Sequence, residues 1–214
     1  FKLHFYNSDG TRGEMCGNGS RCICRFAYDH GIAGEAMVVE ADAGLVPGWR
    51  LAENQYRVKL NNPTVLEPER IPGVAYLELG NPGLPHAVTE VPGLTWADKD
   101  ELRERAKALR YHPDFPKGAN VNFFEIIGED HLYERTWERG VEDFTYACGT
   151  GTGSVVTVLT LLGKVSGKNV KVDMAGGQLV IDVEHTGDHV DNLYLTGPTN
   201  IVCKGEVTDE ELTL

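Results

Sequence analysis

Hydrophobic and polar residues alternate in short stretches along most of this chain. Successive side chains of a strand point to opposite faces, so this period of two predicts strands with one buried face. The predicted strands are residues 2–7, 36–41, 46–51, 56–60, 75–79, 87–91, 120–127, 131–138, 170–174, 179–184, 190–195 and 201–207. Ala175, Gly176 and Gly177 predict a hairpin turn between two of them.

Three stretches have a period near 3.6 and predict helices at residues 19–30, 97–110 and 152–162. The first stretch ends at Gly31, a residue that readily adopts the left-handed conformation after a helix. The second carries charges along its outer face. The third is the most apolar, so we expect it to be buried and wrapped by its own sheet.

Many short strands and few helices predict an α+β fold with mostly antiparallel sheets, because parallel pairing requires a crossover between most strands. A break at Asn61-Asn62-Pro63 predicts a boundary between two lobes. We assign residues 1–62 to the first lobe, completed by about 197–214, and residues 63–196 to the second. Each lobe is expected to be a mostly antiparallel sheet or barrel around a central helix.

The composition narrows the classes of function. Of the 214 residues, 41% are hydrophobic and 24% are charged, as in globular proteins. The apolar run 155–162 is much shorter than the about 20 residues of a membrane helix, and the first residues alternate unlike a signal peptide. The formal charge of −12 argues against nucleic acid or a membrane surface as a partner.

The chain has five cysteines, an odd number without a paired framework. Cys16, Cys22 and Cys24 match neither zinc-binding nor redox spacing, so we expect no metal site and a reducing cytoplasm. Cys22, Cys24 and Cys203 fall within predicted elements and are expected in the core.

The two remaining motifs carry the candidate chemistry. Cys16 and Cys148 each begin a Cys-Gly-x-Gly turn that leads into a predicted helix. Unpaired N–H groups and the helix dipole at such a position lower a thiol pKa from about 8.5 to roughly 3.5–7.5. Two such turns predict two matched half-sites in two related, pseudo-symmetric lobes. One cysteine alone would more often be structural, and the glycine spacing after Cys148 is not the dinucleotide fingerprint.

Several separated motifs resemble the diaminopimelate epimerase family. They are Glu-Met-Cys-Gly-Asn-Gly-Ser-Arg-Cys at 14–22, Glu-Arg-Gly-Val at 138–141, Ala-Cys-Gly-Thr-Gly at 147–151 and Leu-Thr-Gly-Pro at 195–198. The resemblance covers nearly the whole chain. It implies the family fold and a cofactor-independent epimerase that interconverts LL- and meso-diaminopimelate for lysine and peptidoglycan synthesis, usually as a homodimer.

The resemblance also implies the roles of individual residues. Cys16 and Cys148 would exchange the α-proton from opposite faces, with Glu138 and His86 assisting proton movement and holding the substrate amine. Further residues expected to contact the substrate are Asn7, Gly17, Asn18, Asn81, Asn120, Arg139, Gly149 and Thr150. Among these, Arg139 would bind the distal carboxylate through two parallel hydrogen bonds.

The sequence departs from the family pattern at three places. Asn81-Pro82-Gly83-Leu84-Pro85-His86 replaces the usual Asn-Pro-His, which displaces either Asn81 or His86. Glu-Asp-Phe at 142–144 reshapes the wall near Cys148. Family members also begin several dozen residues before the position of Phe1, so we expect the start of the first lobe to be missing and the pocket to be less closed to water.

Two other functions stay open. A related racemase or epimerase would act on another amino acid such as histidine or proline, although Arg139, Asn7 and Asn120 favour a second carboxylate. Proline-racemase-like enzymes usually carry histidine at the position of Asn18. A thiol redox or ligand-binding protein would keep the pocket without turnover.

Overall fold

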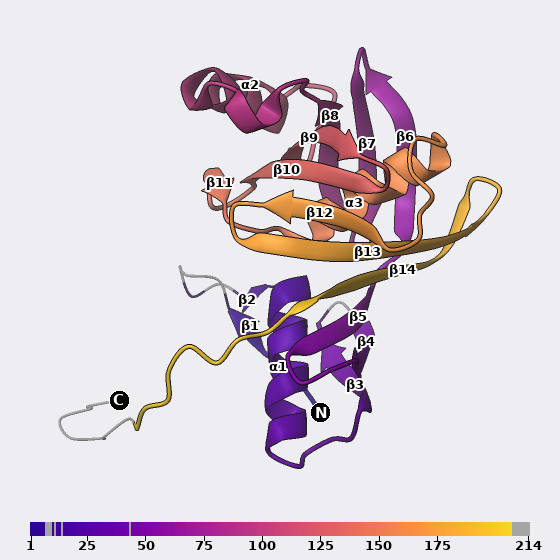
Figure 1. Cartoon of the computed structure of the whole chain (residues 1–214). Helices are drawn as coiled ribbons and strands as arrows, with labels where there is room; N and C mark the ends of the chain where they lie inside the picture. Colours follow the sequence, from indigo (N-terminus) through magenta and orange to yellow (C-terminus); the bar gives the residue numbers. More distant parts are fainter. Residues whose placement is uncertain (7–9, 11, 14, 43, 207–214) are drawn as a thin grey trace.

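The computed structural model describes residues 1–6, 10, 12–13, 15–42 and 44–206 (Figure 1). It has the predicted α+β architecture. The helices are α1 (Gly17–Asp29), α2 (Lys99–Arg110) and α3 (Gly149–Leu161), with a short 3-10 helix at Leu94–Trp96. All three predicted helices are confirmed, with ends that differ by a few residues. No helix in this part of the chain has the length and apolarity needed to cross a membrane.

The strands form one small and one large sheet. The small sheet pairs β1 (Phe5–Tyr6) with β2 (Arg12–Gly13). The strands of the large sheet are β3 (Ala36–Ala41), β4 (Gly44–Arg50), β5 (Gln55–Leu60), β6 (Pro63–Ile71), β7 (Val74–Leu79), β8 (Leu84–Glu90), β9 (Asn120–Gly128), β10 (His131–Glu138), β11 (Asp143–Thr145), β12 (Val170–Met174), β13 (Gly177–Thr186) and β14 (His189–Pro198). Their order is β3-β4-β5-β14-β13-β12-β10-β9-β8-β7-β6, with β11 paired to β10.

Most predicted strands are confirmed, and β3, β10 and β12 agree at both ends. The hairpin turn after β12 is confirmed as well, with Met174 opposite Gly177. The strand predicted at 201–207 is wrong over 201–206, which are exposed and without regular structure. Of the strand predicted at 2–7, residues 2–6 are described, and among these a bridge at Lys2 and the two residues of β1 form. The prediction of a buried Cys24 is confirmed, whereas Cys22 and Cys203 are exposed.

Strand β14 joins the strands around α1 to the strands around α3. It pairs antiparallel with β5 along one edge and with β13 along the other. In Figure 1, α1 lies beside β3, β4 and β5, while α3 lies between the larger group of strands. The two halves therefore share one sheet, which the sequence did not predict. The assignment of the lobe boundary to residue 62 stays a prediction.

Helix α3 is the buried centre of the larger half, as predicted. Every residue from Gly149 to Thr160 is buried, and the helix packs against β7, β8, β9, β13 and β14. Helix α2 covers the opposite face of β9 and places Leu102, Ala106 and Leu109 in a second apolar core. The strands between α2 and α3 consequently have two buried faces, and their alternate side chains enter different cores.

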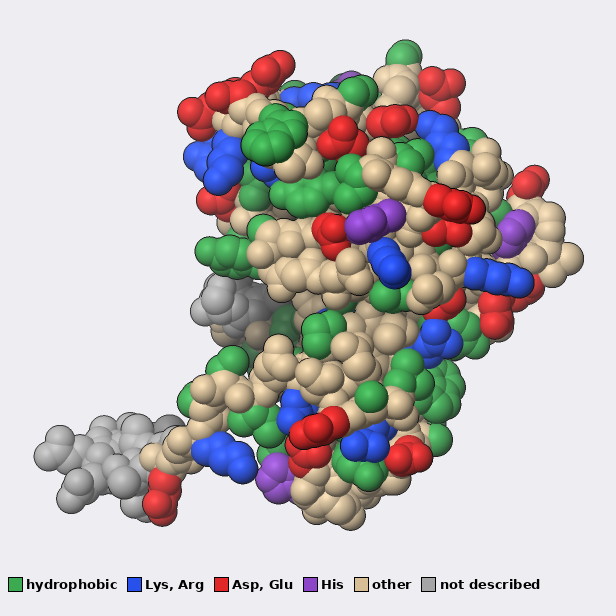
Figure 2. Space-filling model, viewed as in Figure 1, with side chains coloured by type: hydrophobic (Ala, Val, Ile, Leu, Met, Phe, Trp, Pro, Cys, Tyr) green, Lys and Arg blue, Asp and Glu red, His purple; other side chains and the backbone are tan. Residues whose placement is uncertain are grey.

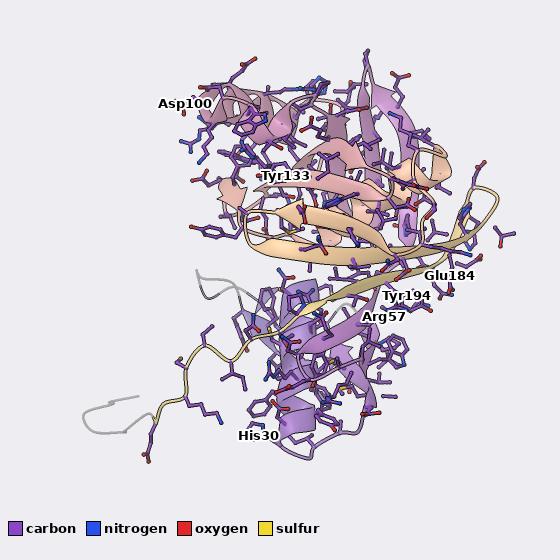
Figure 3. All side chains as sticks on the ribbon, viewed as in Figure 1. His30, Arg57, Asp100, Tyr133, Glu184 and Tyr194 are labelled. Carbon is purple, nitrogen blue, oxygen red and sulfur yellow. The ribbon has the colours of Figure 1, made fainter. Side chains whose placement is uncertain are left out.

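Polar side-chain contacts connect the strands where the two halves meet. Arg57 on β5 lies over the ring of Tyr194 on β14, 5.4 Å from its centroid, and pairs with Asp182 on β13 (Figure 3). In Figure 2, acidic and basic side chains are interspersed on the visible face. Because Arg57 contacts both β14 and the next strand, β13, it stabilises the junction formed by β14.

Candidate active site

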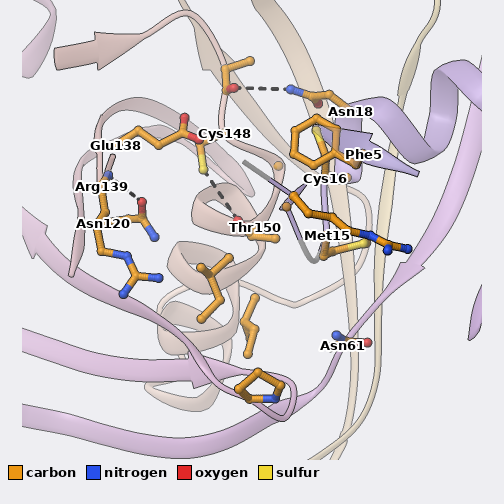
Figure 4. A pocket seen from close by; sticks show the side chains of 18 residues that line it. Phe5, Met15, Cys16, Asn18, Asn61, Asn120, Glu138, Arg139, Cys148 and Thr150 are labelled. Atoms are coloured by element: carbon orange, nitrogen blue, oxygen red, sulfur yellow. Dashed lines mark hydrogen bonds between the residues drawn. The ribbon is translucent and has the colours of Figure 1, made fainter. Parts of the chain in front are cut away.

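Both Cys-Gly-x-Gly turns begin helices, as predicted. Cys16 is the N-cap residue of α1 and Cys148 is the N-cap residue of α3, and both have extended backbones. The two cysteines line the same cavity, which has a volume of about 330 Å³ (Figure 4). This volume is sufficient for a small organic molecule. The structure thus brings two thiols, 132 positions apart in the sequence, to one site.

The two helix N-termini touch because both turns have glycine after the cysteine. A Cβ atom built on Gly149 would lie 2.7 Å from Cδ2 of Leu195 and 3.7 Å from the Cα of Gly17. A Cβ on Gly17 would lie 2.8 Å from the same Leu195 atom. The amide of Asn18 donates a hydrogen bond of 3.3 Å to the carbonyl of Ala147. A Cβ atom at either position would displace the side chain of Leu195, so glycine allows the helix starts to lie this close to β14 and to each other.

Most of the predicted site residues line this cavity. They are Cys16, Gly17, Asn18, Asn120, Glu138, Arg139, Cys148, Gly149 and Thr150. Asn120 on β9 is 3% exposed, and its Oδ1 accepts a hydrogen bond of 2.8 Å from the backbone N–H of Arg139. The guanidinium of Arg139 donates to the carbonyl of Lys117 at 3.0 Å. The turn after β10 is fixed by these bonds, which hold Arg139 at the cavity.

Of the predicted site residues that the structure describes, Asn81 and His86 do not line the cavity. Asn7 lies outside the residues that the structure describes. Asn81 is exposed in a turn, and His86 is fully buried on β8, opposite Asn120 in the strand register. Pro82 and Leu84 form this part of the wall instead. β8 begins at Leu84, so His86 lies inside the sheet and its contact with the substrate stays a prediction.

Comparison with known proteins identifies the family. The sequence model described as diaminopimelate epimerase matches residues 79–202. A protein named diaminopimelate epimerase from Aquifex aeolicus is 38% identical over 218 residues, which cover 99% of this chain and 76% of that protein. This chain belongs to the diaminopimelate epimerase family. A second relative of the same name, from Leptospira biflexa, is 36% identical and is covered to 79% of its length. Epimerases are isomerases, and this family member is an enzyme of that class.

Solved structures share the fold of this diaminopimelate epimerase family member at low sequence identity. A probable proline racemase from Agrobacterium radiobacter K84 superimposes with a TM-score of 0.65 at 17% identity, over 99% of this chain and 73% of the racemase. A phenazine biosynthesis protein of the PhzF family from Enterococcus faecalis gives a TM-score of 0.61 at 14% identity, over 97% and 78%. These likenesses establish the fold alone.

The sequence did not predict the rest of the cavity wall of this family member. These residues are Phe5, Arg12, Gly13, Met15, Asn61, Leu79, Pro82, Leu84 and Ala147. Met15 and Ala147 directly precede the two cysteines. The repeated Cys-Gly-x-Gly motif could therefore have indicated that they line the cavity. Most of the others come from β1, β2, the end of β5 and β7, whose meeting at this site depends on the order of strands.

Burial controls the protonation of both thiols. It raises the pKa of Cys148 to about 12 and also raises the pKa of Cys16. The backbone N–H of Gly19 donates to Sγ of Cys16 at 3.3 Å, which favours the thiolate without reversing the effect of burial. The expectation of acidic thiols is therefore wrong for the structure of this family member, because desolvation outweighs the helix N-terminal N–H groups.

Glu138 lies close enough to act on both thiols. It ends β10 and lines the cavity beside Cys148 (Figure 4). Its negative charge contributes to the raised pKa of each cysteine, and burial raises the pKa of Glu138 itself. In the described part of the chain, no group of three or more His, Cys, Asp or Glu side chains is arranged to hold a metal ion.

Proposed function

We propose that this chain interconverts LL- and meso-diaminopimelate by cofactor-independent proton transfer between Cys16 and Cys148, in lysine and peptidoglycan precursor synthesis. The observation that carries the proposal is the pair of cysteines that cap two touching helices at one cavity. The names of the relatives supply the substrate. The proposal includes a cytoplasmic homodimer with this small molecule as its ligand and with no nucleic-acid or membrane partner.

The geometry suits inversion of a carbon atom that carries a proton. One thiolate removes the α-proton from one face, and the thiol of the other cysteine donates a proton to the opposite face. Negative charge then moves onto the substrate carboxylate. The N–H groups at the starts of α1 and α3, near Gly17 and Gly149, are the donors that would stabilise this charge.

Substrate binding would activate the base. The thiols are protonated at neutral pH because burial and the charge of Glu138 raise their pKa values. An amino-acid substrate brings an α-ammonium group next to the thiols. A positive charge close to a thiol lowers its pKa and so favours the thiolate. The Glu138 carboxylate is the acceptor for this ammonium. The base would therefore form when the substrate is in place.

The far end of the cavity would select a second charged group. Arg139 and the amide of Asn120 line the wall, and the Arg139 guanidinium has the planar geometry that binds carboxylates. This pair supports an amino acid with a distal carboxylate over histidine or proline.

Proton NMR in D₂O tests the proposal. Reduced protein is incubated with meso-diaminopimelate, and in parallel with L-histidine and L-proline, while the α-proton signal is followed. We expect loss of the signal and appearance of the LL isomer with diaminopimelate alone. Exchange with histidine or proline alone would assign another amino-acid substrate, and no exchange with any of them would contradict epimerase activity. Protein alkylated at its thiols serves as the control.

A further inference from the structure

Glu134 is a buried carboxyl group that the proposed proton transfer does not use. It lies on β10 and is 2% exposed. Strand alternation directs Glu134, Thr136 and Glu138 to the same face, toward the start of α3. Within the described residues, no Lys, Arg or His side chain lies at ion-pair distance from Glu134. A buried carboxylate without a cation is costly, so this group needs an explanation.

A chain of hydrogen bonds leads from Glu134 to the peptide of Cys148. Oε2 of Glu134 lies 2.7 Å from the hydroxyl of Thr152, and this hydroxyl lies 2.9 Å from the carbonyl oxygen of Cys148. On the other side, Oε1 lies 3.1 Å from the hydroxyl of Thr136, which lies 3.0 Å from Oδ1 of Asn122. Glu134 therefore connects β9 and β10 to the N-cap residue of α3.

The number of available protons favours the neutral acid. The two ends of the chain, Oδ1 of Asn122 and the Cys148 carbonyl, only accept hydrogen bonds, and each threonine hydroxyl has one proton. The orientation of the Asn122 amide is fixed because its Nδ2 donates to the carbonyl of Ala87 at 3.0 Å. Four oxygen–oxygen contacts run from Asn122 through Thr136, Glu134 and Thr152 to Cys148. When Glu134 is ionised, the two threonine protons serve two of these contacts and leave the other two without a proton. A neutral carboxyl group leaves only one.

The first turn of α3 packs tightly on this network. A Cβ atom on Gly151 would lie 2.3 Å from Oδ1 of Asn122 and 3.1 Å from Oγ1 of Thr136. There is no space between the turn and the side chains of β9 and β10. A displacement in the network therefore moves the turn that carries Cys148.

We propose that Glu134 is a positioning residue for Cys148: as a neutral acid it ties the first turn of α3 to β10 through Thr152 and thereby fixes the thiol. This inference depends on the proposed function. In the neutral form, Glu134 donates to Thr152, whose own proton goes to the Cys148 carbonyl. When Glu134 ionises, the Thr152 hydroxyl turns to the carboxylate, and the Cys148 carbonyl keeps only its bond of 2.9 Å from the backbone N–H of Thr152.

The charges around Glu134 also favour its neutral form. Burial raises the pKa of Glu134 to about 7. The titratable groups that face it are Glu138 on the same strand, Cys148 at the start of α3 and, beyond Asn122, His86 on β8, where burial lowers the histidine pKa to about 3 and keeps the ring neutral. None of them offers a positive charge near pH 7. Ionised Glu134 also contributes to the raised pKa of Cys148.

The test compares Glu134→Gln, Glu134→Leu and Thr152→Val by kcat and KM for epimerisation from pH 6 to 9. Glutamine has the shape and the donor of the neutral acid, so we expect E134Q to restore most of the kcat that E134L loses, about ten- to hundredfold, with little change in KM. We expect the kcat of wild type to decline above pH about 7, where Glu134 ionises, and E134Q should lack this decline. T157V is the matched control, because the buried Thr157 hydroxyl on α3 has no partner among the described residues.

Two readouts need no turnover and separate this inference from the proposed function. Infrared difference spectra of wild type minus E134Q should contain the carbonyl stretch of a protonated carboxylic acid at pH 6. Alkylation of Cys148, mapped by peptide mass spectrometry, should have a lower pH midpoint in E134Q than in wild type. Equal kcat and equal alkylation profiles for wild type, E134Q and E134L would overturn the inference, as would a carboxylate spectrum at pH 6.

Discussion

The turns that begin α1 and α3 share a sequence pattern and differ in what lies beneath them. Under the turn of Cys16 lies Arg21, which is 5% exposed and donates to Oδ1 of Asn18 at 3.0 Å. Under the turn of Cys148 lies Glu134, which is bonded through Thr152. One turn therefore packs on a buried cation and the other on a buried acid.

This difference shows that the same backbone geometry can give two thiols unlike proton affinities. Cys16 is partly exposed, accepts a hydrogen bond from the N–H of Gly19 and lies near the charge of Arg21. Cys148 is buried, and two carboxyl groups contribute to its raised pKa. We therefore expect Cys16 to be the more acidic of the two proposed bases.

The largest effect should come from removing either thiol. Cys16→Ala and Cys148→Ala should each lower the epimerisation rate by about 10²- to 10⁴-fold, because one face of the carbon then lacks its acid or base. Residual exchange of the α-proton in D₂O should involve opposite isomers in the two variants. Melting temperatures close to wild type serve as the control. Substantial epimerisation by either variant would contradict the two-base assignment.

A second prediction concerns the buried acid under α3. Its folded pKa of about 7 lies above the ordinary value of 4.5, so folding takes up a proton between these two pH values. The stability that Glu134 contributes is therefore lost as pH rises from about 4.5 to about 7, on the order of 3 kcal/mol relative to E134Q.

Urea unfolding of wild type and E134Q across this range measures the difference directly. Both proteins are measured because His86 also makes stability depend on pH. Its folded pKa is lowered to about 3, so its contribution to stability rises with pH, opposite to that of Glu134. Parallel pH profiles for wild type and E134Q would mean that Glu134 does not take up a proton on folding. Arg21 stays charged throughout and adds no such dependence to the turn of α1.

Replacing the equivalent glycines of the two turns with alanine should change the stability of the protein in different ways. Gly151→Ala places a methyl group 2.3 Å from Asn122 and should destabilise the protein by about 1–3 kcal/mol. A Cβ on Gly19 lies 3.4 Å from its nearest neighbour, so Gly19→Ala should be tolerated and gain up to about 1 kcal/mol of helix propensity. Urea midpoints measure both changes. Similar midpoints would show that the two turns are equally packed.

The smallest effect concerns the titration of the thiols without substrate. The alkylation rate of Cys16 should rise at a lower pH than that of Cys148, because burial and two carboxyl groups raise the pKa of Cys148. Iodoacetamide time courses with peptide mass spectrometry give both profiles in one sample. Equal midpoints for the two cysteines would contradict the inference that Cys16 is the more acidic thiol.

Local patterns predicted the elements well. The strands at β3, β10 and β12 follow from alternation, and α1 and α3 follow from helical periodicity with glycine turns. Strand β6 was missed because Asn61-Asn62-Pro63 resembles a break, although Pro63 lies at the start of an edge strand, where the missing N–H is tolerated. Residues 201–206 alternate like a strand, yet no neighbouring strand pairs with them.

The site was predicted where two sequence motifs define it and missed where distant segments complete it. Cys16 and Cys148 were found because each turn contains its own signal. The acid beneath Cys148 was not, because Glu134 meets Thr152 only when β10 packs on α3. The thiol pKa values were predicted in the wrong direction because the sequence shows the helix N-terminus and does not show how deeply it is buried.

Strand β14 also has a mechanical consequence. Its ladder to β5 runs from Leu193 opposite Leu60 to Pro198 opposite Gln55, and its other edge is bonded to β13. A torsion of one half against the other that preserves both ladders has its axis along this strand. Leu195 on β14 lies beside Gly17 and Gly149 at the starts of both helices, so both glycine turns lie close to this axis. Such a twist would therefore move the two turns less than the parts of each half that lie far from β14.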